Sequence, residues 1–336
     1  MKAIGFKRSL PITEADSFIL FEIEKPVATE RNLLVKIEAI SVNPVDFKVR
    51  QNSAKEIELT TPKVIGWDAV GIVEEIGSAV TLFKKGDKVF YAGDLTKPGS
   101  NAEYQLIDER IVGLAPKSIT TAEAAALPLT ALTAWEIVFD RIRIGERDKG
   151  KSILIIGGAG GVGSIAIQLA KKVAGLHVIA TASRPETIQW CKDLGADHVV
   201  DHKDLVNELV KIGFKQVDFI LDFVDVNAYW DAMAELIKPQ GHIASITGSA
   251  TPVALNKLKN KSVSFSWELM YTRSMFNTED MIEQHVILTK IAELIDQKEI
   301  KTTLKQVLKG FTVENIKQAH AMLESGKTIG KIVIEL

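Results

Sequence analysis

The chain has 336 residues, 46% hydrophobic and 25% charged, with 41 Lys and Arg residues against 43 Asp and Glu residues. Nearly balanced charge without a Lys/Arg block argues against nucleic-acid binding through a basic face. One cysteine excludes an internal disulfide and a multi-cysteine metal site. The N-terminus has no apolar run typical of a signal peptide, and the most apolar stretch, 124–139, is too short to span a bilayer. We therefore expect a cytoplasmic globular protein of about two domains, bound to neither nucleic acid nor membrane.

The chain changes its hydrophobic pattern near residues 120–130. Before that point, short β-type segments at 34–42, 70–76 and 86–90 are separated by turn residues, which predicts a mainly β region. After it, short apolar runs alternate with helical stretches, which is typical of an α/β domain with a doubly wound parallel sheet. The change predicts a domain boundary.

In the second region the predicted strands are 152–156, 177–181, 199–200, 218–221, 243–246 and 262–269. Helices are expected between them at 164–174, 185–194, 204–212 and 227–237. The last part of the chain has helical spacing over 280–297 and 313–325 and closes with a strand over 331–336.

A glycine-rich turn follows the first of these strands. Gly158, Gly160 and Gly163 have the G-x-G-x-x-G spacing directly before a helix. In that context backbone N–H groups and the positive end of the helix dipole approach a pyrophosphate closely. The alternative is a loop that only packs the helix on the strand. We predict cofactor contacts from Gly158, Ala159, Gly160, Gly161, Val162 and Gly163.

The choice of dinucleotide is expected at the end of the second strand, about 20 residues after the last glycine. NAD enzymes place an acidic residue there, whereas this chain has Ser183 and Arg184. A hydroxyl and a guanidinium bind a 2′-phosphate well, so the residues predict NADPH. The alternative is that Arg184 is a solvated residue at a helix start.

Several sequence blocks, in the same order along the chain, resemble the medium-chain dehydrogenase/reductase superfamily and its quinone oxidoreductase branch. They are 41–46, 64–71, 86–89, 99–104, 127–135, the glycine turn and 330–333. The resemblance implies a Rossmann domain and a catalytic domain like the GroES fold, built from both chain ends. We accordingly expect a catalytic domain over 1–127, a nucleotide-binding domain over 128–270 and a return of 271–336 to the catalytic domain.

The chain departs from the zinc alcohol dehydrogenases of this superfamily at their metal ligands. Those enzymes have a cysteine near the position of Asn43 and a His-Glu pair where this chain has Trp67 and Asp68. All six histidines and Cys191 lie beyond residue 176. Zinc sites need several converging N or S ligands, so we expect no metal. Hydride transfer without a Lewis acid favours quinones and α,β-unsaturated carbonyls, which delocalise the incoming charge themselves.

Four residues are predicted to line the reaction site. Asn43 would donate to the substrate oxygen or hold the nicotinamide ribose, unless it is a simple turn residue. Asp46 and Lys48 would orient each other and water at the pocket mouth, or form a solvated ion pair. Trp67 would be an apolar wall, and Thr130 resembles the family's threonine beside the nicotinamide, with a helix cap as the alternative.

The sequence also gives expectations for a thiol, two tyrosines and four further cofactor contacts. Cys191 is expected to be a packed helix residue rather than a reactive thiol. Tyr91 and Tyr271 are candidate proton donors that the sequence does not place. The remaining predicted cofactor contacts are His202, Phe223, Thr247 and Lys331, with a surface role for His202 and an edge-strand role for Lys331 as alternatives.

The resulting hypothesis is a zinc-independent NADPH-dependent reductase of quinones or enones. It is expected to form a homodimer through the edge strand 262–269, where one face is apolar and the other is serine. Two alternatives stay open, a nucleotide-binding protein of the same fold with little catalytic role and an alcohol or aldehyde dehydrogenase-like activity.

Overall fold

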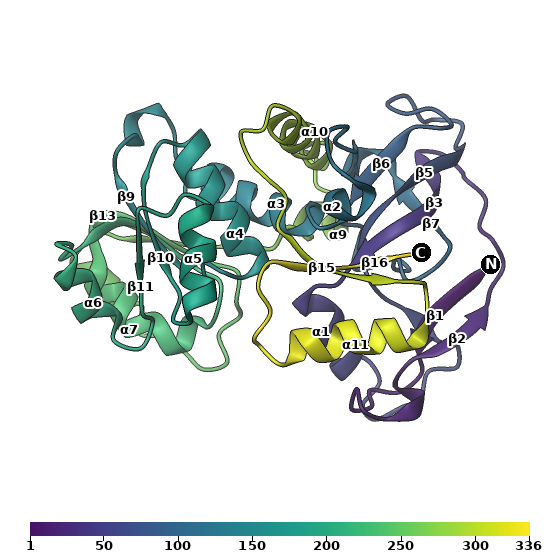
Figure 1. Cartoon of the computed structure of the whole chain (residues 1–336), viewed down its shortest axis with the longest axis horizontal. Helices are drawn as coiled ribbons and strands as arrows, with labels where there is room; N and C mark the ends of the chain where they lie inside the picture. Colours follow the sequence, from purple (N-terminus) through teal and green to yellow (C-terminus); the bar gives the residue numbers. More distant parts are fainter. The chain divides into compact units, whose positions relative to one another are not determined.

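The computed structural model describes all 336 residues, which form two compact units. One unit consists of Met1–Leu129 and Tyr271–Leu336, and the other of Thr130–Met270. Figure 1 shows that the purple N-terminal and yellow C-terminal segments share the first unit. That unit is therefore closed only when the last strand of the chain has returned to the first ones.

The first unit contains two β-sheets. The larger sheet has seven strands, of which six follow the order β15-β16-β3-β5-β6-β8 while β7 pairs with β3. Their bounds are β3 Asn32–Ser41, β5 Asp68–Ile76, β6 Lys88–Tyr91, β7 Tyr104–Asp108, β8 Val112–Leu114, β15 Leu304–Lys309 and β16 Lys331–Glu335. The smaller sheet has the order β2-β1-β4, with β1 Lys2–Phe6, β2 Ile19–Glu22 and β4 Lys63–Val64. The mainly β character predicted for this region is confirmed.

The helices of the first unit pack around these sheets. They are α1 Pro44–Asn52, α2 Thr121–Ala125, α9 Thr272–Phe276, α10 Glu283–Asp296 and α11 Val313–Glu324. The predictions for the last two are confirmed. Helix α1 was not predicted, and a simple turn at Asn43 was the alternative considered. Proline instead occupies the first helical position, where its fixed φ suits the helix and its missing N–H costs nothing.

The second unit is a doubly wound parallel sheet. Its six strands have the order β11-β10-β9-β12-β13-β14, and every neighbouring pair is parallel. Their bounds are β9 Ser152–Ile156, β10 His177–Thr181, β11 His198–Val200, β12 Val217–Asp222, β13 Ile237–Ser245 and β14 Ser264–Trp267. The strand order reverses between β9 and β12, which is where ligands bind in such sheets, beyond the carboxyl ends of the strands.

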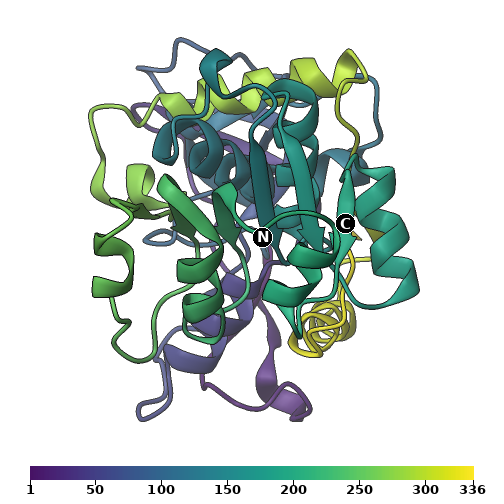
Figure 2. The ribbon, with the colours of Figure 1, turned by 90° about the vertical axis from the view of Figure 1, so that its left-hand side faces the viewer.

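Helices flank this sheet, as Figure 2 shows for the teal and green part of the chain. They are α4 Gly161–Gln168, α5 Pro185–Asp193, α6 Leu205–Lys211, α7 Val226–Leu236 and α8 Asn256–Lys259, while α3 Pro128–Trp135 begins with the last two residues of the first unit. Strand β9 is wholly buried, as its continuous apolar sequence predicts. The helix after the glycines was predicted from Ser164 but starts at Gly161, because the glycines themselves form its first turn.

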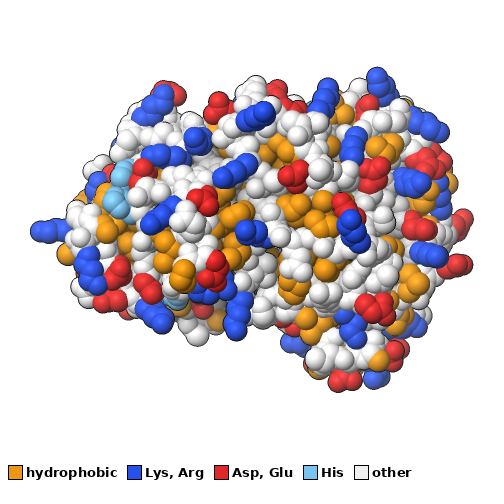
Figure 3. Space-filling model, in the orientation of Figure 1, with side chains coloured by type: hydrophobic (Ala, Val, Ile, Leu, Met, Phe, Trp, Pro, Cys, Tyr) orange, Lys and Arg blue, Asp and Glu red, His pale blue; other side chains and the backbone are white.

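Charged side chains are interspersed over the surface. On the face shown in Figure 3, blue basic and red acidic residues alternate, and neither sign forms a large area. None of the helices combines the length and the apolar character needed to cross a membrane.

A buried histidine lies where α11 packs in the first unit. His320 is 0% exposed, its ring centroid is 4.9 Å from that of Phe18, and neither ring nitrogen has a hydrogen-bond partner. Nearby Arg50 is also buried and forms an ion pair with Glu324 at 2.5 Å. Burial, with a contribution from the charge of Arg50, lowers the pKa of His320 to about 3. The folded chain therefore resists protonation of this ring.

This burial makes stability depend on pH. The unfolded chain binds a proton at His320 near its ordinary pKa of about 6.5, so acidification favours unfolding until the folded pKa is reached. From about pH 7.5 to about pH 5 the free energy of unfolding should fall by about 2 kcal/mol through this group. Urea titrations should show that this part of the loss is absent in His320→Leu and retained in His202→Gln, which changes a half-exposed histidine. An equal loss in His320→Leu and the native chain would contradict the assignment.

Candidate active site

A buried cluster of polar residues surrounds the side chain of Lys331 in the first unit. Its ammonium donates to the carbonyl of Val42 at 2.9 Å, to Oδ1 of Asn43 and to Oδ2 of Asp68 at 3.2 Å. Lys331 is 3% exposed and Asp68 is 0% exposed. Strand register produces this meeting, because β16 and β5 both pair with β3, whose last residue Ser41 lies opposite Val333 and Asp68.

Asp68 links this cluster to the start of α3. Its Oδ2 also accepts from Nδ2 of Asn43 at 2.8 Å, and its Oδ1 accepts from the backbone N–H of Leu129 at 2.7 Å. A carboxylate at the first turn of a helix is stabilised by the helix dipole. Burial raises the pKa of Asp68, and Lys331 and these N–H donors oppose the rise. Asp68 was absent from the predicted site, although its place after Gly66 and Trp67 was a usable signal.

Asn43 belongs to this cluster, and Thr130 follows Leu129 in the sequence. Asn43 is the N-cap residue of α1, but its side chain bonds to Lys331 and Asp68 instead of capping the helix. It is therefore neither a simple turn residue nor a free donor. Thr130 is buried in the first turn of α3, directly after Leu129. Lys331, predicted as a cofactor contact, lies with Asn43 in the cluster and does not merely flank an edge strand.

The expected pairing of Asp46 with Lys48 is wrong. Asp46 is fully buried and accepts from the backbone N–H of Asn43 at 2.8 Å, while Lys48 is exposed. Residues two apart on a helix do not share a face, and the sequence was not recognised as helical here. Burial raises the pKa of Asp46 to about 7, and its Oδ1 has no hydrogen-bond partner.

Aromatic side chains are packed beside the cluster. Trp67 is fully buried, its indole N–H donates to the carbonyl of Asp94 at 3.0 Å, and its ring meets that of Tyr271 edge-on at 6.2 Å. The hydroxyls of Tyr271 and Tyr91 are buried without a hydrogen-bond partner. Burial raises the pKa of Tyr271, and the charges of Asp46, Asp68 and Asp94 add to the rise.

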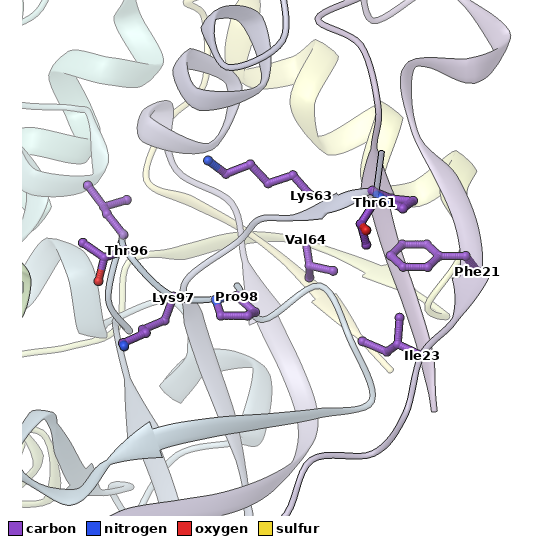
Figure 4. Close-up of a pocket in the computed structure, with 10 residues that line it drawn as sticks. Phe21, Ile23, Thr61, Lys63, Val64, Thr96, Lys97 and Pro98 are labelled. Atoms are coloured by element: carbon purple, nitrogen blue, oxygen red, sulfur yellow. The ribbon is translucent and has the colours of Figure 1, made fainter. Parts of the chain in front are cut away.

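A separate hollow of about 330 Å³ lies on the first unit, as Figure 4 shows. Its lining is mainly apolar, with Phe21, Ile23 and Val64 on one side and the segment 95–98 on the other. Lys63 and Lys97 also line it. None of the cluster residues described above belongs to the lining, so this hollow is distinct from the candidate active site.

The glycine turn of the second unit joins β9 to α4. A Cβ on Gly163 would lie 2.2 Å from the carbonyl oxygen of Gly157, and one on Gly158 would lie 2.8 Å from Cβ of Ala180 and 3.1 Å from Sγ of Cys191. These two glycines are required for packing. Cys191 is buried there and its pKa is raised to about 12 by burial, which confirms the prediction of a packed residue.

Gly160 differs from its neighbours because space is open beside it. A Cβ there would meet only the Gly157 carbonyl, at an ordinary 3.5 Å. Gly160 is the N-cap of α4, and the first turn of a helix presents N–H groups without intrahelical acceptors. The turn therefore fits an anion, with room for a pyrophosphate to approach the backbone.

The residues predicted to select the cofactor lie at the carboxyl edge of the sheet. Ser183 and Arg184 follow β10, and Arg184 begins α5 as its N-cap. The Arg184 side chain is 40% exposed and its Nε lies 3.3 Å from a carboxylate oxygen of Glu186. His202 follows β11, where its Nδ1 lies 3.6 Å from Asp201.

Asp222, at the end of β12, organises the loops next to the strand reversal. It is fully buried and accepts from the hydroxyls of Ser245 at 2.8 Å and Thr247 at 3.1 Å. Its other oxygen accepts from the N–H of Val224 at 3.0 Å. Phe223, half-buried, follows Asp222 and donates its backbone N–H to the last residue of β9. Phe223 and Thr247 thus lie on adjacent loops beside the glycine turn.

Comparison with known proteins gives the family. The alcohol dehydrogenase GroES-like domain matches residues 29–130, and the zinc-binding dehydrogenase family matches residues 194–334. A zinc-type alcohol dehydrogenase-like protein of Staphylococcus aureus is 46% identical, with both chains covered completely. The chain belongs to the medium-chain dehydrogenase/reductase superfamily, in its quinone oxidoreductase branch. It is an oxidoreductase built from a GroES-like catalytic domain and a Rossmann domain.

Other members of the superfamily extend this similarity. A structure from Rhizobium etli, assigned as a zinc-dependent alcohol dehydrogenase, has a TM-score of 0.95 and 47% identity over 100% of this chain and 98% of that one. The Escherichia coli quinone oxidoreductase in complex with NADPH has a TM-score of 0.85 and 26% identity over the full length of both. The NADPH-dependent alkenal/one oxidoreductase of Arabidopsis thaliana is 32% identical over 92% of this chain and 73% of its own.

The name of the zinc-binding family raises the question of whether these residues fit zinc, and they do not. Asn43 and Trp67 stand where zinc alcohol dehydrogenases have a cysteine and a histidine. The amide of Asn43 is bonded to Asp68 and Lys331, and the indole of Trp67 is a donor bonded to a carbonyl. The oxygens that converge here already surround an ammonium, which repels a metal ion.

Proposed function

We propose that this oxidoreductase uses NADPH to reduce a quinone or an α,β-unsaturated carbonyl without a metal. The observation that carries the proposal is the closed cluster of Asn43, Asp68 and Lys331, which has a fixed ammonium in a site without N or S metal donors. The names of the Arabidopsis and Escherichia coli relatives support both the cofactor and the substrate class.

The second unit supplies the features that a dinucleotide needs. The open space at Gly160 and the N-terminus of α4 suit the pyrophosphate, and Arg184 with Ser183 suits a 2′-phosphate. When bound, NADPH supplies the hydride. Phe223 and Thr247, on the loops beside the turn, are proposed to contact the cofactor, as is His202 after β11.

The residues of the first unit favour an acceptor that spreads its own charge. After hydride reaches carbon, the negative charge moves to a conjugated oxygen, and one proton completes the reduced product. Asp46, with a pKa of about 7 and an unpartnered Oδ1, holds a proton that can be given up in the physiological range. Asp46 is fully buried and close enough to the buried Tyr271 for its charge to raise the pKa of that tyrosine, and low exposure to water strengthens any charge interaction.

A small panel of acceptors tests this function against its alternatives. With metal-free protein and NADPH, absorbance at the nicotinamide band should fall with 1,4-benzoquinone, 9,10-phenanthrenequinone or an alkyl enone, and stay constant with a simple aldehyde. Turnover of aldehyde alone would instead support an alcohol dehydrogenase-like activity. NADPH binding by fluorescence without turnover of any acceptor would favour a nucleotide-binding protein.

The choice of NADPH over NADH is tested at Arg184. Arg184→Ala should raise the KM for NADPH at least about tenfold and leave that for NADH nearly unchanged, because a charge-assisted contact to the 2′-phosphate is lost. Lys192→Ala removes an exposed positive charge from the same helix and should change neither constant. The assignment fails when the ratio of the two KM values is the same in Arg184→Ala and the native protein.

We also propose a homodimer formed through β14. This strand is the last in its sheet, and Trp267 and Leu269 are each 48% exposed. Phe265 packs edge-on against both Trp230 and Trp267, so the aromatic face is continuous with the core. An edge strand with unpaired backbone groups pairs readily with its own copy across a two-fold axis.

The dimer predicts a specific effect of charge on this strand. Sedimentation velocity of the native protein should give a dimer, and Trp267→Glu should give a monomer because a carboxylate would be buried in the interface. Leu255→Glu, at an exposed position of the same unit, should remain dimeric. A native monomer, or a dimer unaffected by Trp267→Glu, would rule out this interface.

A further inference from the structure

We propose that Lys331 is a positioning residue, a built-in cation that keeps Asp68 ionised and, through Asp68, fixes the start of α3 where Thr130 lies. This inference rests on the proposed function for its meaning in catalysis. Its structural part, the coupling of Lys331 to the charge of Asp68, can be measured without any substrate.

The hydrogen bonds of Lys331 match the capacity of an ammonium group. Such a group has three N–H donors and no acceptor. Here it meets three oxygens, from Val42, Asn43 and Asp68, and is almost fully buried. No donor is left for a phosphate or a substrate oxygen. Lys331 therefore acts on the reaction site through these partners rather than by contact.

The bonds of Asp68 match an ionised carboxylate. Its two oxygens accept from three N–H groups, those of Leu129, Asn43 and Lys331. A protonated carboxyl would present an O–H to this ring of donors and lose at least one of the bonds. The bond to Leu129 is the one that reaches α3, so ionisation of Asp68 and the position of Thr130 are linked.

The other titratable groups facing Asp68 cannot replace Lys331. Asp46 adds negative charge when ionised, and Tyr271 is neutral with a raised pKa. Burial raises the pKa of Asp68, and the charge of Lys331 is the largest effect that opposes it. Removing one partner of a buried ion pair leaves the other uncompensated. Without the ammonium, the pKa of the carboxyl would rise further.

The first experiment measures unfolding of the ligand-free protein by urea between about pH 5 and about pH 9. In Lys331→Met the folded pKa of Asp68 rises further above its unfolded value. Stability should therefore be lost as pH rises, more steeply than in the native chain. The double variant Lys331→Met/Asp68→Asn should remove the added slope, and Lys309→Met, an exposed lysine on the neighbouring β15, should not have it. Equal slopes in Lys331→Met and the native chain would overturn the proposal.

The second experiment measures reductase activity over the same pH range. Lys331→Met should be at least about tenfold slower than the native enzyme near pH 6, with kcat affected more than KM, and the gap should narrow near pH 9 as Asp68 ionises. A loss of equal size at every pH would indicate a merely structural role. A loss of NADPH affinity with an unchanged kcat would identify Lys331 as a cofactor contact instead.

The unfolding slopes test the role of Lys331, and the activity measurements test the proposed reductase function, so failure of one can be told from failure of the other. If the native protein reduces no acceptor, the reductase assignment fails, while the unfolding slopes still decide whether Lys331 sets the charge of Asp68. If Lys331→Met does not fold, the stability of Asp68→Asn is compared with that of the double variant. The double variant should be the more stable of these two, since it buries no unpaired ammonium, and the reverse order would overturn the proposal.

Discussion

A buried ammonium and a buried carboxylate, Lys331 and Asp68, join three distant parts of the chain. Lys331 begins the last strand, Asp68 begins β5, and Leu129 is the last residue of the catalytic domain before the Rossmann domain begins. Neither charge is tolerable alone at this depth, so each requires the other to be in place. The return of β16 to β3, which makes one domain from both chain ends, is therefore coupled to the position of Leu129 and to the surroundings of Asn43.

Local patterns explain how much of this could be predicted from the sequence. The wholly apolar run 152–156 and the glycines after it specify a buried strand, a turn and a helix within about a dozen residues, and the structure has them there. The bond between Lys331 and Asp68 spans 263 residues and follows from strand register, which no local pattern contains. For the same reason Asp68 was overlooked and the contacts of Lys331 with Asn43 and Asp68 were not foreseen. Helix α1 was missed because its nine residues include few apolar ones.

The glycine turn and the cluster around Lys331 are built on different principles. The glycine turn depends on the absence of side chains. A Cβ at Gly158 or Gly163 would collide with its neighbours, whereas the space beside Gly160 is open. The cluster around Lys331 depends instead on a complete set of hydrogen bonds. Each N–H of the ammonium has an acceptor, and each oxygen of Asp68 has a donor. Open space beside the backbone suits a site that receives a ligand. A complete set of hydrogen bonds suits a buried cluster that must not move when charge develops nearby.

This complete set of hydrogen bonds constrains the chemistry that the oxidoreductase can perform. A zinc ion exchanges water for substrate and so stabilises a localised alkoxide by direct contact. The ammonium of Lys331 has no vacant position and can only contribute its field, which is long-ranged in dry surroundings but weaker than a bond. Asn43 is held by the same bonds and cannot turn toward a substrate without breaking them. The site would therefore stabilise poorly a negative charge that stays on a single oxygen, whereas a conjugated carbonyl spreads that charge over its own framework. The preference proposed for quinones and enones follows from the occupied hydrogen bonds as much as from the residues that zinc would need.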